Sequence, residues 1–368
     1  MTIMKQNIIR LINLWVLTLL VASGVFGQQK TFTIKNETAH DWKAHVVEIP
    51  WSEVAEGWNP DTSLLIIKTS DGKQLPFQLE TRGEGIVKNL LVQVSAKTGS
   101  SLKLVATHGK RNSFPSRTYA RYVPERYDDF AWENDVMAFR AYGKALEATK
   151  ENALGLDVWA KKTNELVIDK WYKKNDYHRD YGEGLDFYHV GNTLGAGNIA
   201  AFAGDQIVFP ANYVKYEVLD NGPLRSTFRL YHAPWKAGDD DVQLVKEIQL
   251  DAGSYFNKIT ATFESAKKDS IGFCIGIRQN AGNDAVMMNE TAGTMGYWQP
   301  ADAANGVIGI GILVPGIQGE MKQYKGHLLF NSHVASGTPI VYFMGAAWDK
   351  KGDFKSADEW FQFLMHKR

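Results

Sequence analysis

The stretch VQLVKEIQLDAGSYFNKITATF, residues 242–263, shows most clearly what kind of fold this chain adopts. Two runs rich in β-branched and aromatic residues, 242–250 and 256–263, flank the turn-forming segment Asp251–Ser254. Apolar runs of this length on either side of a short polar link with a glycine are typical of an antiparallel hairpin. We therefore predict two long strands joined by a tight connection.

The chain on both sides of this hairpin follows the same pattern. In residues 224–231 apolar side chains fall on one face of a predicted strand, and Arg225, Arg229 and Tyr231 fall on the other. This period of two predicts a sheet with one packed and one solvated face. Further strand-like runs cover residues 31–36, 64–69, 89–96, 101–107, 272–278, 306–313, 327–333 and 339–346.

The clearest helix signal is at the C-terminus. Ser356 and Glu359 form a capping box, and apolar residues follow at helical spacing. Many antiparallel strands with few helices predict an all-β fold, a large antiparallel β-sandwich. A polar segment at residues 108–116 separates a smaller N-terminal β subdomain, residues 28–110, from the β-sandwich catalytic domain, residues 111–368.

The first 27 residues are typical of a secretory signal peptide. Lys5 and Arg10 accompany an apolar run from Leu11 to Phe26, and small residues precede a cleavage site after Gly27. No later segment is long and apolar enough to cross a bilayer. We therefore expect a periplasmic or secreted protein that does not reside in a membrane.

Composition restricts the partners and the chemistry. The 41 basic and 41 acidic residues give a net charge of zero, which argues against nucleic acid or an anionic membrane as partner. The single cysteine, Cys274, lies in an apolar strand-like run and cannot form an internal disulfide. No phosphate-binding, zinc-protease or nucleophile-elbow motif is present, so nucleotide-driven chemistry is not expected.

The segment 121–197 mixes charged, aromatic and glycine residues most densely. It contains RYVPERYDDFAWEND (121–135), DVWAKKTNELVIDKWY (157–172) and DYHRDYGEGLDFYHVGN (176–192). Rings that stack on sugar faces beside side chains that bond hydroxyls are typical of a carbohydrate cleft. The alternative is a solvated, aromatic loop region.

His178 is the first catalytic candidate in this segment. An imidazole flanked by Tyr177 and by acids such as Glu183 and Asp186 suits a general base or acid. With Asp180, these side chains also offer oxygen ligands for a hard cation such as Ca²⁺. We expect no cofactor, and a structural divalent cation and a solvated surface loop remain open alternatives.

Other charged and aromatic side chains are candidates for binding substrate. The cluster of alternating charge at residues 121–133 is either an ion-pair network or a clamp in which arginine holds a substrate carboxylate. The proposed substrate-binding residues are Arg121, Trp132, Lys170, Asp186, Arg225 and Arg229. His189 is a secondary candidate, and His327 and His333 are expected to be structural.

The strings RYVPERYDDFAWEND, DVWAKKT, VIDKWY, YHRDYGEGLDFYHVG and EIQLDAGSYFNK resemble a family of exported Bacteroidetes proteins that carry a domain of unknown function. The resemblance is strongest to members from the polysaccharide-utilisation loci of marine bacteria that degrade ulvan. It implies a galactose-mutarotase-like β-sandwich and a role on uronate-containing oligosaccharides. For the ulvan members it implies an oligosaccharide dehydratase, which eliminates water across C4 and C5 of a non-reducing-end uronate.

This chemistry matches the residues of the segment. Arg126 would neutralise the uronate carboxylate, His178 would remove the C5 proton, and Tyr177 would assist or protonate the leaving hydroxyl. Glu183 and Asp186 would orient the imidazole or bind hydroxyls. The alternatives are a polysaccharide lyase that expels a sugar by β-elimination, a non-catalytic glycan-binding protein, and a mutarotase or epimerase.

Overall fold

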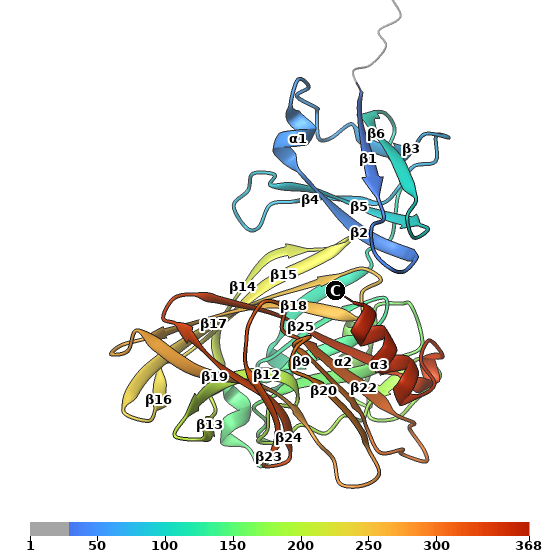
Figure 1. The fold of residues 1–368 in the computed structure, drawn as a ribbon. Helices are drawn as coiled ribbons and strands as arrows, with labels where there is room; N and C mark the ends of the chain where they lie inside the picture. The colour runs from blue at the N-terminus through green and yellow to red at the C-terminus, as the bar shows by residue number, and fades with distance from the viewer. Residues whose placement is uncertain (1–28, 368) are drawn as a thin grey trace, which may run out of the picture.

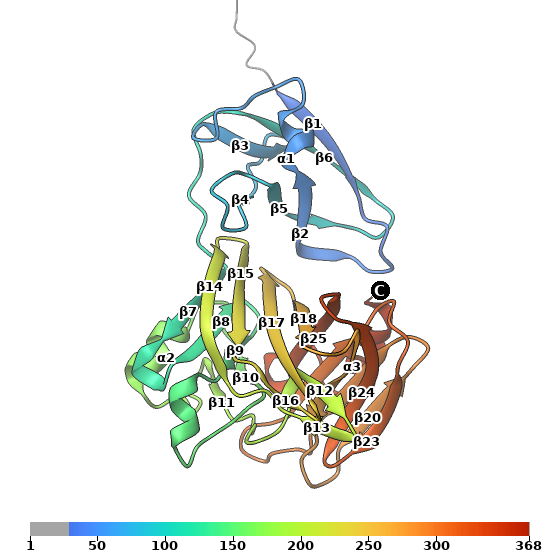
Figure 2. The same ribbon diagram turned by 90° about the vertical axis from the view of Figure 1, so that its left-hand side faces the viewer.

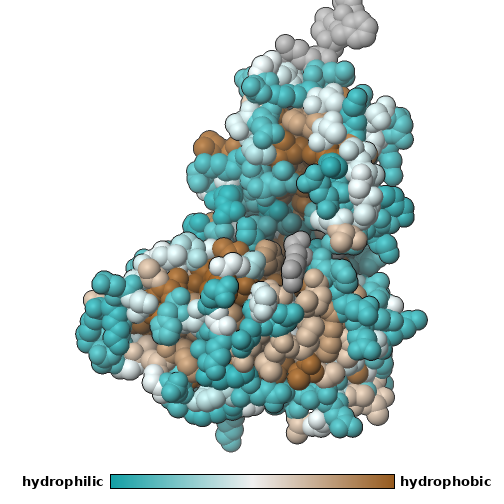
Figure 3. Space-filling view, viewed as in Figure 1, coloured by the Kyte–Doolittle hydropathy of each residue, from teal (hydrophilic) through white to brown (hydrophobic). Residues whose placement is uncertain are grey.

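The computed structural model describes residues 29–367 and shows a small β unit above a larger one (Figure 1). The predicted signal peptide, residues 1–27 with cleavage after Gly27, lies outside the described residues. Figure 3 shows one face of the molecule, on which hydrophilic residues predominate over both units. Within residues 29–367, no helix is both long and apolar enough to span a membrane.

The N-terminal unit consists of two sheets that no later strand joins, with strand orders β1-β6-β3 and β2-β5-β4. Its elements are β1 (Lys30–Lys35), β2 (Trp42–Pro50), α1 (Trp51–Ala55), β3 (Leu65–Thr69), β4 (Phe77–Glu80), β5 (Asn89–Ala96) and β6 (Ser101–His108). Buried residues such as Val47, Leu65 and Leu90 fill the space between the two sheets.

The larger unit contains three antiparallel sheets, two of five strands and one of nine. The first has the order β11-β10-β9-β8-β7 and includes β7 (Thr118–Val123), β8 (Asp129–Asn134), β9 (Ala138–Ala141), β10 (Leu156–Lys161) and β11 (Gly184–Asp186). The second has the order β13-β12-β19-β24-β23 and includes β12 (Ala196–Ala203), β13 (Gln206–Val208), β19 (Ser270–Arg278), β23 (Glu320–Tyr324) and β24 (His327–Ala335).

The nine-stranded sheet crosses the middle of the larger unit, as Figure 2 shows from the side. It is formed by β14 (Tyr213–Asn221), β15 (Arg225–His232), β16 (Trp235–Ala237), β17 (Asp240–Asp251), β18 (Phe256–Ser265), β20 (Ala285–Asn289), β21 (Thr294–Trp298), β22 (Ile308–Leu313) and β25 (Pro339–Trp348). The helical segments of this unit are η1 (Pro124–Arg126), η2 (Lys144–Ala148), α2 (Ile168–Lys174), η3 (Asp349–Lys351) and α3 (Ala357–His366).

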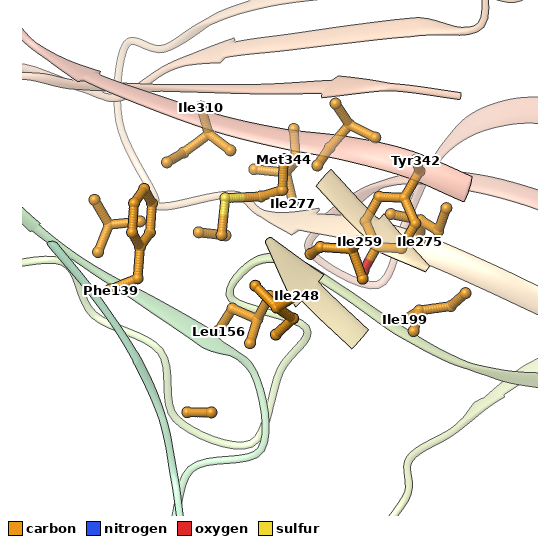
Figure 4. Close-up of a cluster of buried hydrophobic side chains, with 14 of the residues drawn as sticks. Phe139, Leu156, Ile199, Ile248, Ile259, Ile275, Ile277, Ile310, Tyr342 and Met344 are labelled. Atoms are coloured by element: carbon orange, nitrogen blue, oxygen red, sulfur yellow. The ribbon is translucent and has the colours of Figure 1, made fainter. Parts of the chain in front are cut away.

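Side chains from all three sheets meet in one apolar core (Figure 4). Phe139 and Leu156 come from the first sheet, Ile275 from the second, and Ile248 and Ile259 from the nine-stranded sheet. Each is at most 1% exposed. This shared core confirms the predicted large antiparallel β-sandwich.

The local predictions agree with the structure at the hairpin and at the C-terminal helix. Strands β17 and β18 pair antiparallel, with Leu250 opposite Asn257. Helix α3 begins after Ser356, whose hydroxyl accepts a hydrogen bond from the Glu359 amide at 3.3 Å. Cys274 is buried in β19, where burial raises the pKa of its thiol. Helix α2 was not predicted.

The prediction of a solvated face on strand β15 is wrong at Arg225. Its side chain is only 5% exposed because the N-terminal unit covers this end of the strand. The guanidinium pairs with Asp251 at 2.6 Å, Glu48 at 2.6 Å and Glu80 at 3.1 Å. These three carboxylates occupy the N–H donors of Arg225 that a substrate would need. Arg225 is therefore part of the interface between the units.

Gln78 and a small apolar contact complete this interface. The Gln78 side-chain oxygen accepts from the amides of Leu224 and Arg225 at 2.8 Å each, and its nitrogen donates to the Arg225 carbonyl at 3.1 Å. The buried apolar contact is formed by Val46, Leu91, Leu224 and Ala252. Directional bonds and apolar burial together hold the two units in one arrangement.

Lys246 of β17 is a charged group inside the sandwich. It is 2% exposed and donates to Asn198 Oδ1 at 2.8 Å, and burial lowers its pKa from 10.5 to about 7. Between these two pH values the unfolded chain binds more protons at this residue than the folded one. The free energy of unfolding should therefore rise with pH by up to about 1.4 kcal/mol per unit from this group alone.

Replacing Lys246 with Met should remove this contribution to the pH slope. Urea unfolding of both proteins at several pH values between 7 and 10 measures the difference in slope. Lys258→Met, which changes an exposed lysine on the neighbouring strand β18, is the matched control and should leave the slope unchanged. Equal slopes for wild type and Lys246→Met would show that Lys246 is charged in the folded state.

Candidate functional site

The sheet β7–β11 has one apolar face and one charged face, because its residues alternate along each strand. In β8, Phe130 and Trp132 belong to the apolar core, whereas Asp129 and Glu133 lie on the other face. The charged face carries six ionisable residues that are each at most 5% exposed: Asp129, Glu133, Arg140, Asp157, Lys161 and Asp186. A burial of this kind requires a cover and partners for the charges.

Helix α2 and the following loop provide the cover. Trp159 of β10 stacks on Trp171 of α2 at 5.7 Å between ring centroids, and on Tyr177 of the loop at 4.9 Å. Glu133 accepts hydrogen bonds from the amides of Val167 and Ile168, at 2.7 and 2.8 Å. A carboxylate at a helix N-terminus satisfies amides that otherwise lack partners. Glu133 thereby fixes where the cover begins.

Arg140 is at the centre of the charged face, among three aspartates. Its Nε donates to Asp157 at 2.9 Å, Nη2 donates to Asp186 at 2.9 Å, and Nη1 lies 3.6 Å from Asp129. Burial raises the pKa of Asp129 to about 7, against the attraction of Arg140 and Arg126. Burial and repulsion from Asp157 also raise the pKa of Asp186. Burial in this cluster therefore favours the protonated forms of Asp129 and Asp186 relative to the same groups in water.

His178 lies above this cluster, with its side chain 67% exposed. Its Nδ1 is 3.0 Å from the main-chain oxygen of Asp186 and 3.6 Å from the Asp186 carboxylate. A carbonyl oxygen only accepts, so Nδ1 carries the hydrogen and the neutral ring has its lone pair on Nε2. The Asp186 contacts thus orient the imidazole as a base toward solvent.

Tyr177 and Arg126 lie next to this imidazole. The Tyr177 ring is 4.6 Å from the His178 ring, and its hydroxyl accepts a hydrogen bond from Arg126 Nε at 3.2 Å. Arg126 Nη2 pairs with the exposed Glu151 at 2.8 Å, whereas Nη1 has no partner among the described residues. Three of the four residues proposed as catalytic from the sequence, Arg126, Tyr177 and His178, therefore lie together here.

Glu183 and Lys170 lie beside this group rather than within it. They form an ion pair with each other at the edge of a cavity of about 370 Å³, which Tyr177 and Arg179 also line. Arg121 lies on β7, where it pairs with Glu125 of η1 at 2.6 Å and with Asp169 of α2 at 2.7 Å. For Arg121 the structure therefore agrees with the ion-pair interpretation of the charged cluster.

Two predicted substrate-binding residues lie elsewhere. Trp132 is fully buried and donates to Asn257 Oδ1 at 2.7 Å inside the core, so the prediction that it stacks on a sugar is wrong. Arg229 lies on β15, where it pairs with Glu247 at 3.0 Å and Glu217 at 3.6 Å. His327 is structural as predicted, since its Nε2 accepts from the Leu194 amide at 3.1 Å.

The proposed calcium ligands do not converge. Asp180 pairs with Lys162, Glu183 with Lys170 and Asp186 with Arg140. In residues 29–367, no three histidine, cysteine or acidic side chains come close enough to hold a metal ion.

Sequence reasoning missed Arg140, Asp157 and Tyr142. Arg140 Nη2 lies 3.4 Å from the Tyr142 hydroxyl. All three belong to β9, β10 or the residue after β9. Arg140 and Tyr142 lie between the polar strings quoted from this segment, and Asp157 is the first residue of the second string. The available signal was the alternation of charged and apolar residues in AFRAY and LDVWAK. This alternation indicates a second, charged face of the sheet, and that face cannot be exposed to solvent on every strand.

Comparison with known proteins places the chain by family. A model described as Domain of unknown function (DUF4861) matches residues 34–368. The chain belongs to this family. A relative from Formosa agariphila, called Uncharacterized protein P7, is 30% identical over 265 residues, which cover 67% of this chain and 66% of that protein. This similarity to a protein of a Bacteroidetes organism agrees with the resemblance described above.

Two solved structures from Enterococcus faecalis have similar chain arrangements. An alpha-mannosidase from strain V583 matches with a TM-score of 0.47 and 10% identity, over 90% of this chain and 45% of that chain. A protein in the Glycosyl Hydrolase Family 38 matches with a TM-score of 0.47 and 10% identity, over 91% of this chain and 47% of that chain. The DUF4861 chain thus spans less than half of either protein.

Proposed function

We propose that the protein is a lyase-class enzyme that eliminates water across C4 and C5 of a uronic acid at the non-reducing end of ulvan-type oligosaccharides. The observation that carries the proposal is His178, whose Nδ1 contacts Asp186 so that Nε2 is free at the surface beside Arg126 and Tyr177. The ulvan specificity comes from the sequence resemblance. Export to the periplasm or the medium remains a prediction.

The elimination begins at the C5 proton, which is weakly acidic because it is α to the uronate carboxylate. Arg126 would bind this carboxylate in place of the exposed Glu151 and stabilise the enolate-like charge that develops on it. His178 Nε2 takes the proton, and the electron pair of the C5–H bond forms the C4–C5 double bond.

The C4–O bond then breaks, and the leaving hydroxyl takes up a proton to depart as water. Tyr177 is the candidate donor, because its hydroxyl is 3.2 Å from Arg126 Nε and its ring lies against that of His178. The proton held by His178 then returns to the Tyr177 oxygen, directly or by exchange with solvent, which restores both side chains. The products are a 4,5-unsaturated uronate and one water, so atoms and charge balance.

The test uses the purified chain with ulvan oligosaccharides that end in a saturated uronate. We expect new ultraviolet absorbance from the conjugated acid and a loss of one water in mass, without shortening of the chain. New absorbance with shorter products would instead identify a polysaccharide lyase, since the same base chemistry then expels a sugar. Binding without any product would favour a non-catalytic glycan-binding protein.

A further inference from the structure

We infer that a second binding site, for an anionic sugar residue of an oligosaccharide, lies in the cleft between the N-terminal unit and the β-sandwich. The cleft has a volume of about 640 Å³ and is lined by β2 with the loop before it, the β17–β18 turn, the segment after β25 and the end of α3. Figures 1 and 2 show the C-terminal end of α3 close to β2, and His366 lines the same cavity as His45. Cavities of this size hold small ligands.

The walls of the cleft are held in place without a ligand. Arg225 links Asp251, which lines the cleft, to Glu48 and Glu80 of the N-terminal unit. Val46 and Ala252, which also line it, pack in the apolar contact between the units. A preformed cavity needs little ordering when a ligand binds.

Four basic side chains of the cleft make no direct hydrogen bond or ion pair in the described part of the chain. Within residues 29–367, no hydrogen bond or ion pair engages the side-chain nitrogens of His40, His45, Lys351 or Lys367, and all four side chains line the cavity. The charged form of a half-buried basic group is unfavourable unless an anion joins it. The cleft therefore presents basic groups that remain available to a ligand.

The acidic side chains of the same cleft are already engaged. Their partners are Lys97 for Asp41 at 2.6 Å, Arg117 for Asp135 at 2.7 Å, Arg225 for Asp251 at 2.6 Å and the Tyr255 hydroxyl for Asp353. These contacts leave the basic groups, rather than the acidic ones, free to bind. The chemistry of the cleft thus selects an anion.

The pKa values of the basic groups in the cleft indicate that anion binding is coupled to protonation. Burial, followed by repulsion from Lys367, lowers the pKa of His45 to about 4, against the attraction of Asp251. Burial, Lys367 and His366 also lower the pKa of His40, whereas the attraction of Asp41 raises it. Burial also lowers the pKa of Lys367. An anion in the cleft would raise these pKa values, so binding should be coupled to proton uptake.

Burial lowers the pKa of Lys351 as well, and the positive Lys161 adds to the effect, whereas Asp353 and Asp135 oppose it. Aromatic rings lie among these cations. Trp42 stacks on His45 with 4.6 Å between centroids, and Tyr255 and Phe363 also line the cavity. Rings beside cations suit a sugar ring that carries a sulfate or a carboxylate.

This site is distinct from the one proposed for catalysis. None of Arg126, Tyr177 and His178 lines the cleft. The inference does not depend on the proposed reaction, because it concerns binding alone.

The experiment is calorimetric titration of the full chain carrying Arg126→Ala, which weakens binding at the proposed catalytic site. The probes are trigalacturonate, a κ-carrageenan tetrasaccharide and neutral maltotriose. We expect at least one anionic probe to bind with an enthalpy that depends on the buffer's ionisation enthalpy, as proton uptake requires. Binding of trigalacturonate alone would identify a carboxylate site, and binding of carrageenan alone a sulfate site.

Adding Lys351→Ala should weaken this binding by about tenfold, as expected for the loss of one charge-assisted contact. His45→Gln is the second variant, and circular dichroism checks that both fold. The matched control is Lys350→Ala, the neighbouring lysine of η3, which does not line the cleft. Three results would overturn the inference. They are an affinity for maltotriose equal to that for the anionic probes, no binding of either anionic probe, and unchanged affinity for the anionic probes in both folded variants.

Discussion

Replacing His178 with Ala should lower the rate of unsaturated-uronate formation by about a thousandfold, within the range that a general base contributes. The side chain is 67% exposed and makes its contacts only with Asp186 and the neighbouring ring, so its removal should leave the fold intact. Initial rates from ultraviolet absorbance, with circular dichroism of both proteins, measure the effect.

The matched control is His189→Ala, which removes another exposed histidine of the same segment outside the Arg126–Tyr177–His178 group. It should retain normal turnover. Near-normal activity of a folded His178→Ala protein would remove His178 from the mechanism, and Tyr177→Phe would then test whether the hydroxyl beside Arg126 is the base.

The parts of the fold that were predictable are those specified by nearby residues. The β17–β18 hairpin follows from two apolar runs around Asp251–Ser254, and α3 follows from its cap at Ser356. Helix α2 was missed because it is only seven residues long, too short for the helical spacing of Ile168, Trp171 and Tyr172 to stand out in the sequence. Its N-terminus is instead fixed by the distant Glu133, which lies on another strand.

The candidate site was predictable in part for the same reason. Tyr177, His178 and Asp186 are close in sequence, and a single hydrogen bond brings Arg126 to them. Arg225 was misplaced because the N-terminal unit, more than a hundred residues earlier, covers a strand face that looks solvated in isolation. Such contacts between distant segments leave no local pattern in a single sequence.

The largest loss of stability should come from breaking the buried ion pair between Glu133 and Lys161. Both side chains are 0% exposed, and Lys161 Nζ donates to Glu133 at 2.6 Å and to the Asn134 carbonyl at 2.7 Å. Lys161→Met leaves the Glu133 carboxylate buried without its cation. Removing one member of a buried pair costs about 3–5 kcal/mol, and we expect a loss of this size in urea unfolding at pH 7.

The stability lost by Lys161→Met should become smaller as the pH falls, because Glu133 can then bind a proton. Burial raises the pKa of this carboxyl above 4.5, against the attraction of Lys161, so removing Lys161 raises it further. Above pH 4.5 the folded variant then holds a proton that the unfolded chain releases, which makes the folded state less favourable as pH rises.

Lys162→Met, which breaks the exposed pair with Asp180, is the control and should cost less than about 1 kcal/mol. An equal cost for both variants would show that Glu133 is neutral in the native protein. In that case α2, and with it the cover over Arg140, would be held by hydrogen bonds rather than by charge.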